Sequence, residues 1–312
     1  MPEMVMAREA YGDLLVELGM RDPDVVVLDA DLASSTKTGK FAKKFPERFF
    51  NCGIAEQNMI NVAAGLAVAG KKPFVSTFAI FGSGRAWEQI RNTLAVGRLN
   101  VKVVVTHGGI SVGPDGVSHQ SLEDISLMRS IPEMKVLVPC DAPEAVAAVR
   151  AAYEIKGPVY VRLGRPKVPT IWIGDTFTIG KAQLVKEGID ITIVACGIMV
   201  NEALQAEKIL SGKGISAEII NMGTIKPLDG ALLLASVKKT GCVMTCEEHG
   251  VIGGLGSAVS EYLSQTYPVP QKFVGVQDRF GQSGDPADLM NEYELSAGHI
   301  VRFAEALIQK KK

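Results

Sequence analysis

The sequence has no excess of charge of either sign. Among its 312 residues, 33 are lysine or arginine and 34 are aspartate or glutamate, which gives a formal net charge of −1. Proteins that bind nucleic acids or membrane surfaces usually carry a basic excess. We therefore expect neither a nucleic-acid partner nor a membrane partner. The length suffices for two ordinary domains with full cores.

Cysteine is scarce, and no two cysteines have the spacing of a redox or zinc motif. The five cysteines are scattered, and the nearest pair, Cys242 and Cys246, is separated by three residues. A Cys-x-x-Cys motif would leave two residues between them. We therefore expect buried free thiols in a reducing cytoplasm.

The sequence also lacks the signals that direct a chain to or across a membrane. Residues 1–8 show no basic start followed by an apolar core, so we expect no secretory signal. The uncharged run over residues 57–70 is shorter than the roughly 20 apolar residues that a membrane-spanning helix needs. There is no internal repeat and no low-complexity tract. These absences predict a soluble, cytoplasmic protein.

Short apolar runs alternate with helical patterns along the chain. In the first part we expect strands at 25–28, 101–105, 135–138 and 157–163, and helices at 7–18, 60–70, 86–96 and 122–129. In the second part we expect strands at 191–196, 217–220, 242–245 and 272–276, and helices at 200–211, 230–240, 254–264 and 296–309. Such alternation predicts an α/β fold with a mainly parallel sheet covered by helices.

Two prolines break this pattern near the middle of the chain. Pro166 and Pro169 lie in a stretch without clear periodicity, so residues 166–181 are predicted to be a linker. The linker would join a first domain over residues 1–165 to a smaller α/β domain over residues 182–312.

Polar loops follow two of the predicted strands. The stretch from Asp31 to Ser35 comes directly after the strand at 25–28. The stretch from His107 to Gln120 follows the strand at 101–105 and contains four glycines, two histidines and one aspartate. Ligands gather at the carboxyl ends of strands in open α/β sheets, and long polar loops in compact domains are usually functional.

Glu56 lies at or near the first turn of a predicted buried helix. Apolar residues follow it at helical spacing: Met59, Ile60, Val62, Ala63, Leu66 and Ala67. A carboxylate at this position is stabilised by the helix dipole, which is a sufficient structural reason for it. A catalytic role is the alternative, and the residues alone leave both interpretations open.

Two segments around this helix resemble the pyrimidine-binding domain of thiamine-diphosphate enzymes. They are Gly53-Ile-Ala-Glu-Gln-Asn and Ser76-Thr-Phe-Ala-Ile-Phe81. The resemblance implies that Glu56 contacts N1′ of the cofactor's aminopyrimidine and takes part in catalysis. It also implies that Phe78 stacks on the pyrimidine ring and that Phe81 lies close by.

The loop from His107 to Gln120 narrows the resemblance to transketolases. Its segment Asp115-Gly-Val-Ser-His119-Gln is similar to the Asp-Gly-Pro-Thr-His-Gln segment of that family. The resemblance implies that His119 is catalytic and contacts the C1 hydroxyl of the donor sugar, and that Asp115 contacts an acceptor hydroxyl. His107 and Arg165 would bind the sugar phosphate, and Arg162 would stay inside its strand.

Two segments near the start of the chain also resemble transketolases. Met6-Ala-Arg8 and the stretch from Asp31 to Ser35 offer Arg8 and Ser35 as phosphate ligands and Asp31 as a residue near the cofactor. Arginines, a histidine and a hydroxyl suit a phosphate dianion. Each residue also has a structural alternative, because Arg8 can be a solvated helix residue and Asp31 can cap a turn.

One motif of the family is absent. Transketolases hold the diphosphate and its metal through a Gly-Asp-Gly motif in an N-terminal domain, and this sequence contains no such motif. The resemblance therefore implies a split enzyme, in which a separate N-terminal subunit supplies the diphosphate site and the Mg²⁺ or Ca²⁺ ligands. Two copies of each chain would form an α2β2 assembly. Gly84 stands where many transketolases have a tyrosine, so the packing around the pyrimidine can differ.

The implied reaction is transfer of a two-carbon ketol unit from a ketose phosphate to an aldose phosphate, as in the pentose phosphate pathway. Three alternatives remain at this stage: the β subunit of a 2-oxoacid dehydrogenase E1 component, a deoxyxylulose-phosphate synthase, and an orphan subunit without catalysis. Two glycine-rich stretches, at 195–200 and 249–256, allow either an anion site at a helix start or close packing of helix on sheet.

Overall fold

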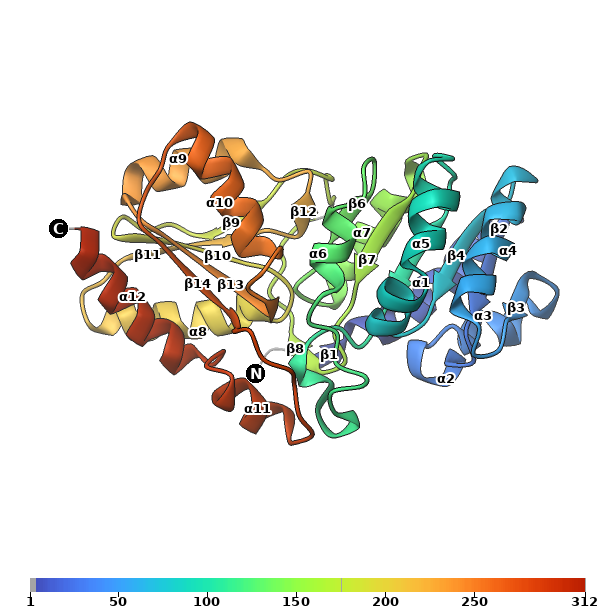
Figure 1. The fold of residues 1–312 in the computed structure, drawn as a ribbon, viewed down its shortest axis with the longest axis horizontal. Coiled ribbons are helices and arrows are strands. Elements are labelled where there is room, and N and C mark those ends of the chain that lie inside the picture. Colours follow the sequence, from blue (N-terminus) through green and yellow to red (C-terminus); the bar gives the residue numbers. More distant parts are fainter. Residues whose placement is uncertain (1–3, 175, 312) are drawn as a thin grey trace.

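The structure is a computed structural model that describes residues 4–174 and 176–311. The first sheet is built from β2 Val25–Asp29, β3 Phe49–Asn51, β4 Lys72–Ser76, β5 Lys102–Val105, β6 Lys135–Leu137, β7 Val159–Arg162 and β12 Thr224–Lys226. The strand order is β12-β6-β7-β5-β4-β2-β3 (Figure 1). Neighbouring strands are parallel, except that β12 is antiparallel to β6.

Helices cover both faces of this sheet. They are α1 Ala7–Arg21, α2 Ala33–Thr36, α3 Gly39–Lys44, α4 Glu56–Val68, α5 Trp87–Gln89, α6 Asp124–Arg129 and α7 Ala142–Glu154. Val25 and Val27 of β2 belong to a core cluster with α1 and α7, whereas Val26 and Leu28 belong to a cluster with α4 and α6. Because side chains alternate along a strand and both faces are covered, the strand reads as a continuous apolar run.

The second sheet has the order β14-β13-β10-β11-β9. Its strands are β9 Gln183–Lys186, β10 Ile191–Ala195, β11 Ala217–Asn221, β13 Val243–Gly250 and β14 Gln271–Val276. Its helices are α8 Met199–Gly212, α9 Gly230–Thr240, α10 Leu255–Thr266, α11 Pro286–Glu292 and α12 Ala297–Lys311. Residues of α8 and α12 pack on one face, and residues of α9 and α10 pack on the other. The predicted fold class, a mainly parallel sheet covered by helices followed by a smaller α/β unit, is confirmed.

The two units are joined by more than the connecting segment. β12 lies at residues 224–226, far beyond the predicted linker, yet it extends the edge of the first sheet beside β6. One core cluster contains Val103 of the first sheet as well as Val194 and Ile220 of the second. Figure 1 shows the units side by side, with β12 between them.

The structure differs from the sequence-based predictions in two places. The predicted linker at 166–181 begins with β8 (Lys167–Pro169), which pairs antiparallel with β1 (Met4–Met6). The predicted helix at 86–96 belongs to a longer segment in which two π-helical turns, η2 Phe81–Arg85 and η3 Ile90–Ala95, flank α5. Short elements depend on distant pairing, so three-residue strands leave almost no periodic signal.

None of the helices in the described part of the chain is both long and apolar enough to cross a membrane. The five cysteines are free thiols.

A buried ion pair lies at the carboxyl end of β7. Arg162 Nε donates to Asp124 Oδ2 at 2.8 Å, and the Tyr160 hydroxyl donates to the same oxygen at 2.8 Å. Both charged side chains are almost fully buried. The charge on Asp124 and the nearby Glu248 raise the pKa of Arg162 despite its burial, so the guanidinium stays charged. Removing one partner would leave the other charge buried and unpaired.

We predict that Asp124→Asn lowers the free energy of unfolding by about 3–5 kcal/mol, because Arg162 loses its counter-charge inside the protein. Glu17→Gln is the matched control, since it breaks the partly exposed Arg150–Glu17 pair and should cost less than about 1 kcal/mol. Urea denaturation followed by circular dichroism measures both. Equal stability of the two variants would contradict this account of the pair.

Candidate active site

Most of the predicted site residues lie in the segments that follow β2, β4, β5 and β7, whereas Arg8 lies on α1 and Glu56 begins α4. Phe78 follows β4 and forms an isolated bridge with Thr106, which follows β5. These strands are neighbours in the sheet, so their following loops meet at one edge. We call residues 107–120 the histidine loop. Its residues 110–115 form the 3₁₀ helix η4 (Ile110–Asp115), where the sequence predicted irregular loop.

A buried carboxylate shapes the loop after β2. Asp29 accepts hydrogen bonds from Leu32 N at 2.6 Å, Thr36 Oγ1 at 2.7 Å and Thr38 Oγ1 at 2.8 Å. Burial raises the pKa of Asp29, while these hydrogen bonds favour its charged form. The loop between these anchors carries Asp31, in a left-handed conformation with φ 65°, and Ser35. Sequence analysis did not single out Asp29, although a charge ending an apolar strand was the available signal.

Four rings gather at the sheet edge. The Phe78 and His107 rings stack with their centroids 3.8 Å apart, and the Phe81 ring lies 6.0 Å from that of Phe78. The His119 ring meets Phe81 edge-on at 5.3 Å. The structure thus brings the two phenylalanines predicted at the cofactor, which follow β4, together with both histidines of the histidine loop.

His107 is held as a neutral imidazole. Its Nδ1 lies 2.7 Å from Thr106 Oγ1, and its Nε2 lies 3.4 Å from Arg8 Nη1. Because Arg8 can only donate, Nε2 is the acceptor and Nδ1 carries the proton. Burial, followed by the charges of Arg8 and Arg165, lowers the pKa of His107 to about 3. Its backbone takes φ 60°, which is uncommon outside glycine and often found at functional sites.

Two arginines converge beside His107. Arg8 Nη1 donates to the Ser35 carbonyl at 2.9 Å, and Arg165 Nη1 donates to the Val112 carbonyl at 2.5 Å. Burial and the charge of Arg165 lower the pKa of Arg8, so the two cations disfavour each other. A bound anion would relieve this repulsion. The structure therefore assembles Arg8, Ser35, Arg165 and His107 into one positive site.

Glu56 begins α4 and is only 3% exposed. Arg85 Nη1 lies 3.2 and 3.3 Å from its two carboxylate oxygens, and the Arg85 guanidinium lies over the Phe81 ring at 4.2 Å. One guanidinium therefore spans from the carboxylate to the aromatic group. Sequence analysis missed Arg85, because a half-exposed arginine in a helical pattern gives no distinctive signal.

Asp31 and Asp115 form no direct hydrogen bond with this group in the described part of the chain. Both are exposed, and Asp31 accepts a hydrogen bond from Asn51 Nδ2 at 3.0 Å. Among the described residues, neither carboxylate has a hydrogen bond to the arginines, the histidines or Glu56.

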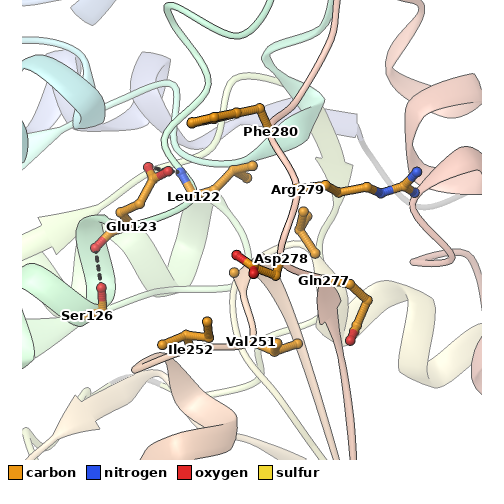
Figure 2. A pocket seen from close by; sticks show the side chains of 11 residues that line it. Leu122, Glu123, Ser126, Val251, Ile252, Gln277, Asp278, Arg279 and Phe280 are labelled. Carbon is orange, nitrogen blue, oxygen red and sulfur yellow. Dashed lines mark hydrogen bonds between the residues drawn. The ribbon is translucent and has the colours of Figure 1, made fainter.

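A cavity of about 360 Å³ lies in the seam between the two units. Figure 2 shows Leu122 and Glu123 on one side of it and Val251, Ile252 and Asp278 on the other. None of the predicted site residues is among its lining residues.

The glycine-rich stretch at 249–256 is not open to an anion. The Glu247 carboxylate accepts hydrogen bonds from Leu255 N at 2.7 Å and Gly256 N at 2.8 Å, so it fills the amino end of α10. A Cβ at Gly254 or Gly256 would collide with neighbouring side chains. Close packing, rather than anion binding, explains these glycines.

Known protein families match both units of the chain. The transketolase pyrimidine-binding domain matches residues 3–170, and the transketolase C-terminal domain matches residues 180–300. The chain belongs to the transketolase family. Among solved structures, the chain is similar to a split-gene transketolase described as an inactive β4 tetramer. The TM-score is 0.92 and the sequence identity 52%, and the match covers 99% of this chain and 100% of that one.

Two relatives within the transketolase family are named as enzyme subunits. The 6-deoxy-6-sulfo-D-fructose transketolase subunit SqwH of Clostridium sp. (strain MSTE9) is 45% identical over 97% of this chain and 95% of its own length. A subunit of the apulose-4-phosphate transketolase of Phocaeicola vulgatus is 38% identical over 98% of this chain and 99% of its own length.

The residues of this transketolase-family chain fit the pyrimidine end of thiamine diphosphate. A buried carboxylate can hydrogen-bond to an aminopyrimidine and a half-buried aromatic ring can stack on it, and Arg85 contacts both groups here. In the described part of the chain, no three His, Cys, Asp or Glu side chains lie together as metal ligands.

We predict that His107 makes the protein less stable as the pH falls below about 6.5, the ordinary histidine pKa. The folded state keeps His107 neutral down to about pH 3, whereas the unfolded chain takes up a proton below its ordinary pKa. Proton uptake therefore stabilises the unfolded state relative to the folded state. The slope should reach about 1.4 kcal/mol per pH unit. Urea denaturation between pH 4 and 7 should show a shallower slope for His107→Asn. Equal slopes would mean that His107 titrates normally.

Proposed function

We propose that this chain is the pyrimidine-binding and C-terminal subunit of a split, thiamine-diphosphate-dependent transketolase. It would transfer a two-carbon ketol unit from a ketose phosphate to an aldose phosphate. The proposal rests on two groups of residues that lie side by side, one suited to the cofactor and one to the substrate. Glu56 and Phe81 lie together through Arg85, and a positive site around His107 lies beside the same aromatic rings.

When bound, thiamine diphosphate supplies a nucleophilic carbon that attacks the sugar carbonyl. Glu56 would hold a proton at the pyrimidine nitrogen N1′, and this requires Arg85 to yield part of its contact with the carboxylate. Phe78 is 5% exposed, with one face covered by His107, whereas Phe81 is half-buried. We therefore propose Phe81 as the main stacking surface and Phe78 as its support, with Asp31 at the rim of the cofactor site.

The positive site would take the sugar phosphate. Arg8 and Arg165 supply charge, and neutral His107 adds no third buried charge. To donate a hydrogen bond to the phosphate, the His107 ring would carry its proton on Nε2, and Arg8 would turn from Nε2 to the phosphate. Arg8 donates to the Ser35 carbonyl, and the Ser35 hydroxyl would add a further hydrogen bond to the phosphate. His119 would contact the C1 hydroxyl of the donor, and Asp115, on an exposed turn, would meet the acceptor.

The outer face of α4 is suited to contact a separate N-terminal subunit. α4 carries a single charged residue, the buried Glu56, and the residues on its exposed side are uncharged. Ile54 just before it is 77% exposed, and Val68 at its end is 75% exposed. Val62, predicted to be buried, is 37% exposed. An uncharged helix face next to the group suited to the cofactor suits a partner that closes the site.

The partner would supply the diphosphate site and Mg²⁺ or Ca²⁺, in an α2β2 assembly. The similarity to named subunits, and to a β4 tetramer that is inactive, supports this division. Those subunits are named for different sugars, so the pentose phosphate pair is the first pair to test rather than a conclusion. The free cysteines support a cytoplasmic location.

The test combines the chain with a candidate N-terminal subunit, thiamine diphosphate, Mg²⁺, xylulose 5-phosphate and ribose 5-phosphate. We expect sedoheptulose 7-phosphate, measured by mass spectrometry. Glu56→Gln should lower kcat by about 10²–10⁴-fold, because the proton at N1′ loses its partner. Glu88→Gln, an exposed carboxylate nearby, is the matched control. Decarboxylation of pyruvate in place of ketol transfer would favour an E1-type enzyme, and normal turnover by Glu56→Gln would reject the proton role.

The partner surface makes a separate prediction. Ile54→Arg and Val68→Arg should each weaken the affinity for the N-terminal subunit about tenfold or more, since a charge would be buried in an apolar contact. Analytical ultracentrifugation of mixtures at fixed ratio measures the complex. Ile189→Arg, at an exposed apolar position in the second unit, is the control. Unchanged affinity of both α4 variants would place the partner elsewhere.

A further inference from the structure

The second unit reaches into the histidine loop. Glu248, on β13, is 3% exposed, and its Oε1 accepts a hydrogen bond from Ser111 N at 2.5 Å. Gly109 takes φ 94°, and a Cβ there would overlap the Glu248 carboxyl group. The loop backbone is therefore fitted to this side chain, both by a hydrogen bond and by the absence of a side chain at Gly109.

In a second contact, the loop is the donor and the second unit the acceptor. The Gln120 side-chain amide donates to the Gln282 carbonyl at 2.9 Å and to the Ile110 carbonyl at 3.1 Å. It thus ties the end of the loop to its beginning and to the segment before α11. A Cβ at Gly113 would lie 3.0 Å from the Pro286 ring, so the loop also packs against α11. Figure 1 shows the green loop beside the red segment that leads to α11.

Arg162 fixes Glu248 from the other side. Its Nη2 donates to the Glu248 carbonyl at 2.8 Å and to the Ser121 carbonyl at 3.3 Å, directly after the loop. Because Arg162 is itself paired with Asp124, Glu248 cannot shift without disturbing a buried ion pair. The position of the Glu248 carboxylate, which supports the loop, is therefore fixed.

We propose that Glu248 is a positioning residue for the transketolase reaction, and that the C-terminal unit acts in catalysis by holding the histidine loop. The Glu248 carboxylate fixes the loop backbone at Ser111, so that His107 keeps its stack on Phe78 and His119 keeps its contact with Phe81. This assignment rests on the proposed function for its catalytic meaning. The mechanical part, support of the loop by Glu248, stands on the contacts alone.

The size of the effect follows from geometry. A displacement of about 1 Å in a group that orients substrate can cost about 100-fold in rate. Loss of the Ser111 contact leaves a buried backbone N–H without its partner, which favours a shifted loop. Glu248→Ala removes the acceptor, whereas Glu248→Gln keeps an oxygen that can accept from Ser111 N.

The first experiment uses the full chain alone, with hydrogen exchange measured by mass spectrometry. Glu248→Ala should speed exchange in peptides covering 108–113 by about tenfold or more, and Glu248→Gln should restore most of the protection. Glu247→Gln is the matched control, because this neighbouring buried carboxylate caps α10 and does not contact the loop. It should lower thermal stability and leave loop exchange unchanged. Gln120→Glu, which cannot donate to the Gln282 carbonyl, is a second variant that loosens the loop.

The second experiment uses the reconstituted complex. Glu248→Ala should raise KM for both sugar phosphates by about 10–100-fold, with a smaller change in kcat and unchanged affinity for thiamine diphosphate. Loop exchange in both Glu248→Ala and Gln120→Glu equal to that of the control would overturn the positioning role. If loop exchange rises but the wild-type complex shows no ketol transfer, the proposed function fails while the support of the loop by Glu248 stands.

Discussion

The buried Arg162 guanidinium is the interaction on which the geometry of the site depends. It ends β7 and donates to Asp124, to the Ser121 carbonyl after the histidine loop, and to the Glu248 carbonyl of the second sheet. A charged group without water must satisfy its hydrogen bonds within the protein. Three distant parts of the chain therefore have to meet at one point, and the loop with both histidines is held between them.

The same requirement shapes the neighbouring loops. Asp29 ends β2 and is satisfied by Leu32, Thr36 and Thr38, which sets the turn that carries Asp31 and Ser35. Buried carboxylates and guanidinium groups thus act as fixed centres around which polar backbone is folded. His119 belongs to the loop that Arg162 holds, whereas Phe81 and Arg85 lie in η2, where Arg85 pairs with the buried carboxylate of Glu56.

Much of the fold could be predicted from the sequence, because strands buried on both faces are continuous apolar runs and the helices between them are periodic. The exceptions have local causes. β1 and β8 are three residues each and exist only because they pair, and β12 crosses to the first sheet from a position well inside the second unit. The π-helical turns around α5 are also invisible to a search for a 3.6-residue period. Arg85 lies in this segment, and a half-exposed arginine there carries no signal of its own.

By itself, the sequence determined the α/β class, the position of Glu56 in or near the first turn of a helix, and the resemblance of the aromatic, histidine and arginine residues to a transketolase set. These features depend on local periodicity and on motifs that stay within short segments. Only the tertiary structure decided that His107 is neutral, that Phe81 is more accessible than Phe78, and that Glu248 supports the histidine loop. These outcomes depend on burial, on the distance between like charges, and on a hydrogen bond between residues 137 positions apart in the sequence. All three are properties of the folded chain, and no local sequence pattern indicates them.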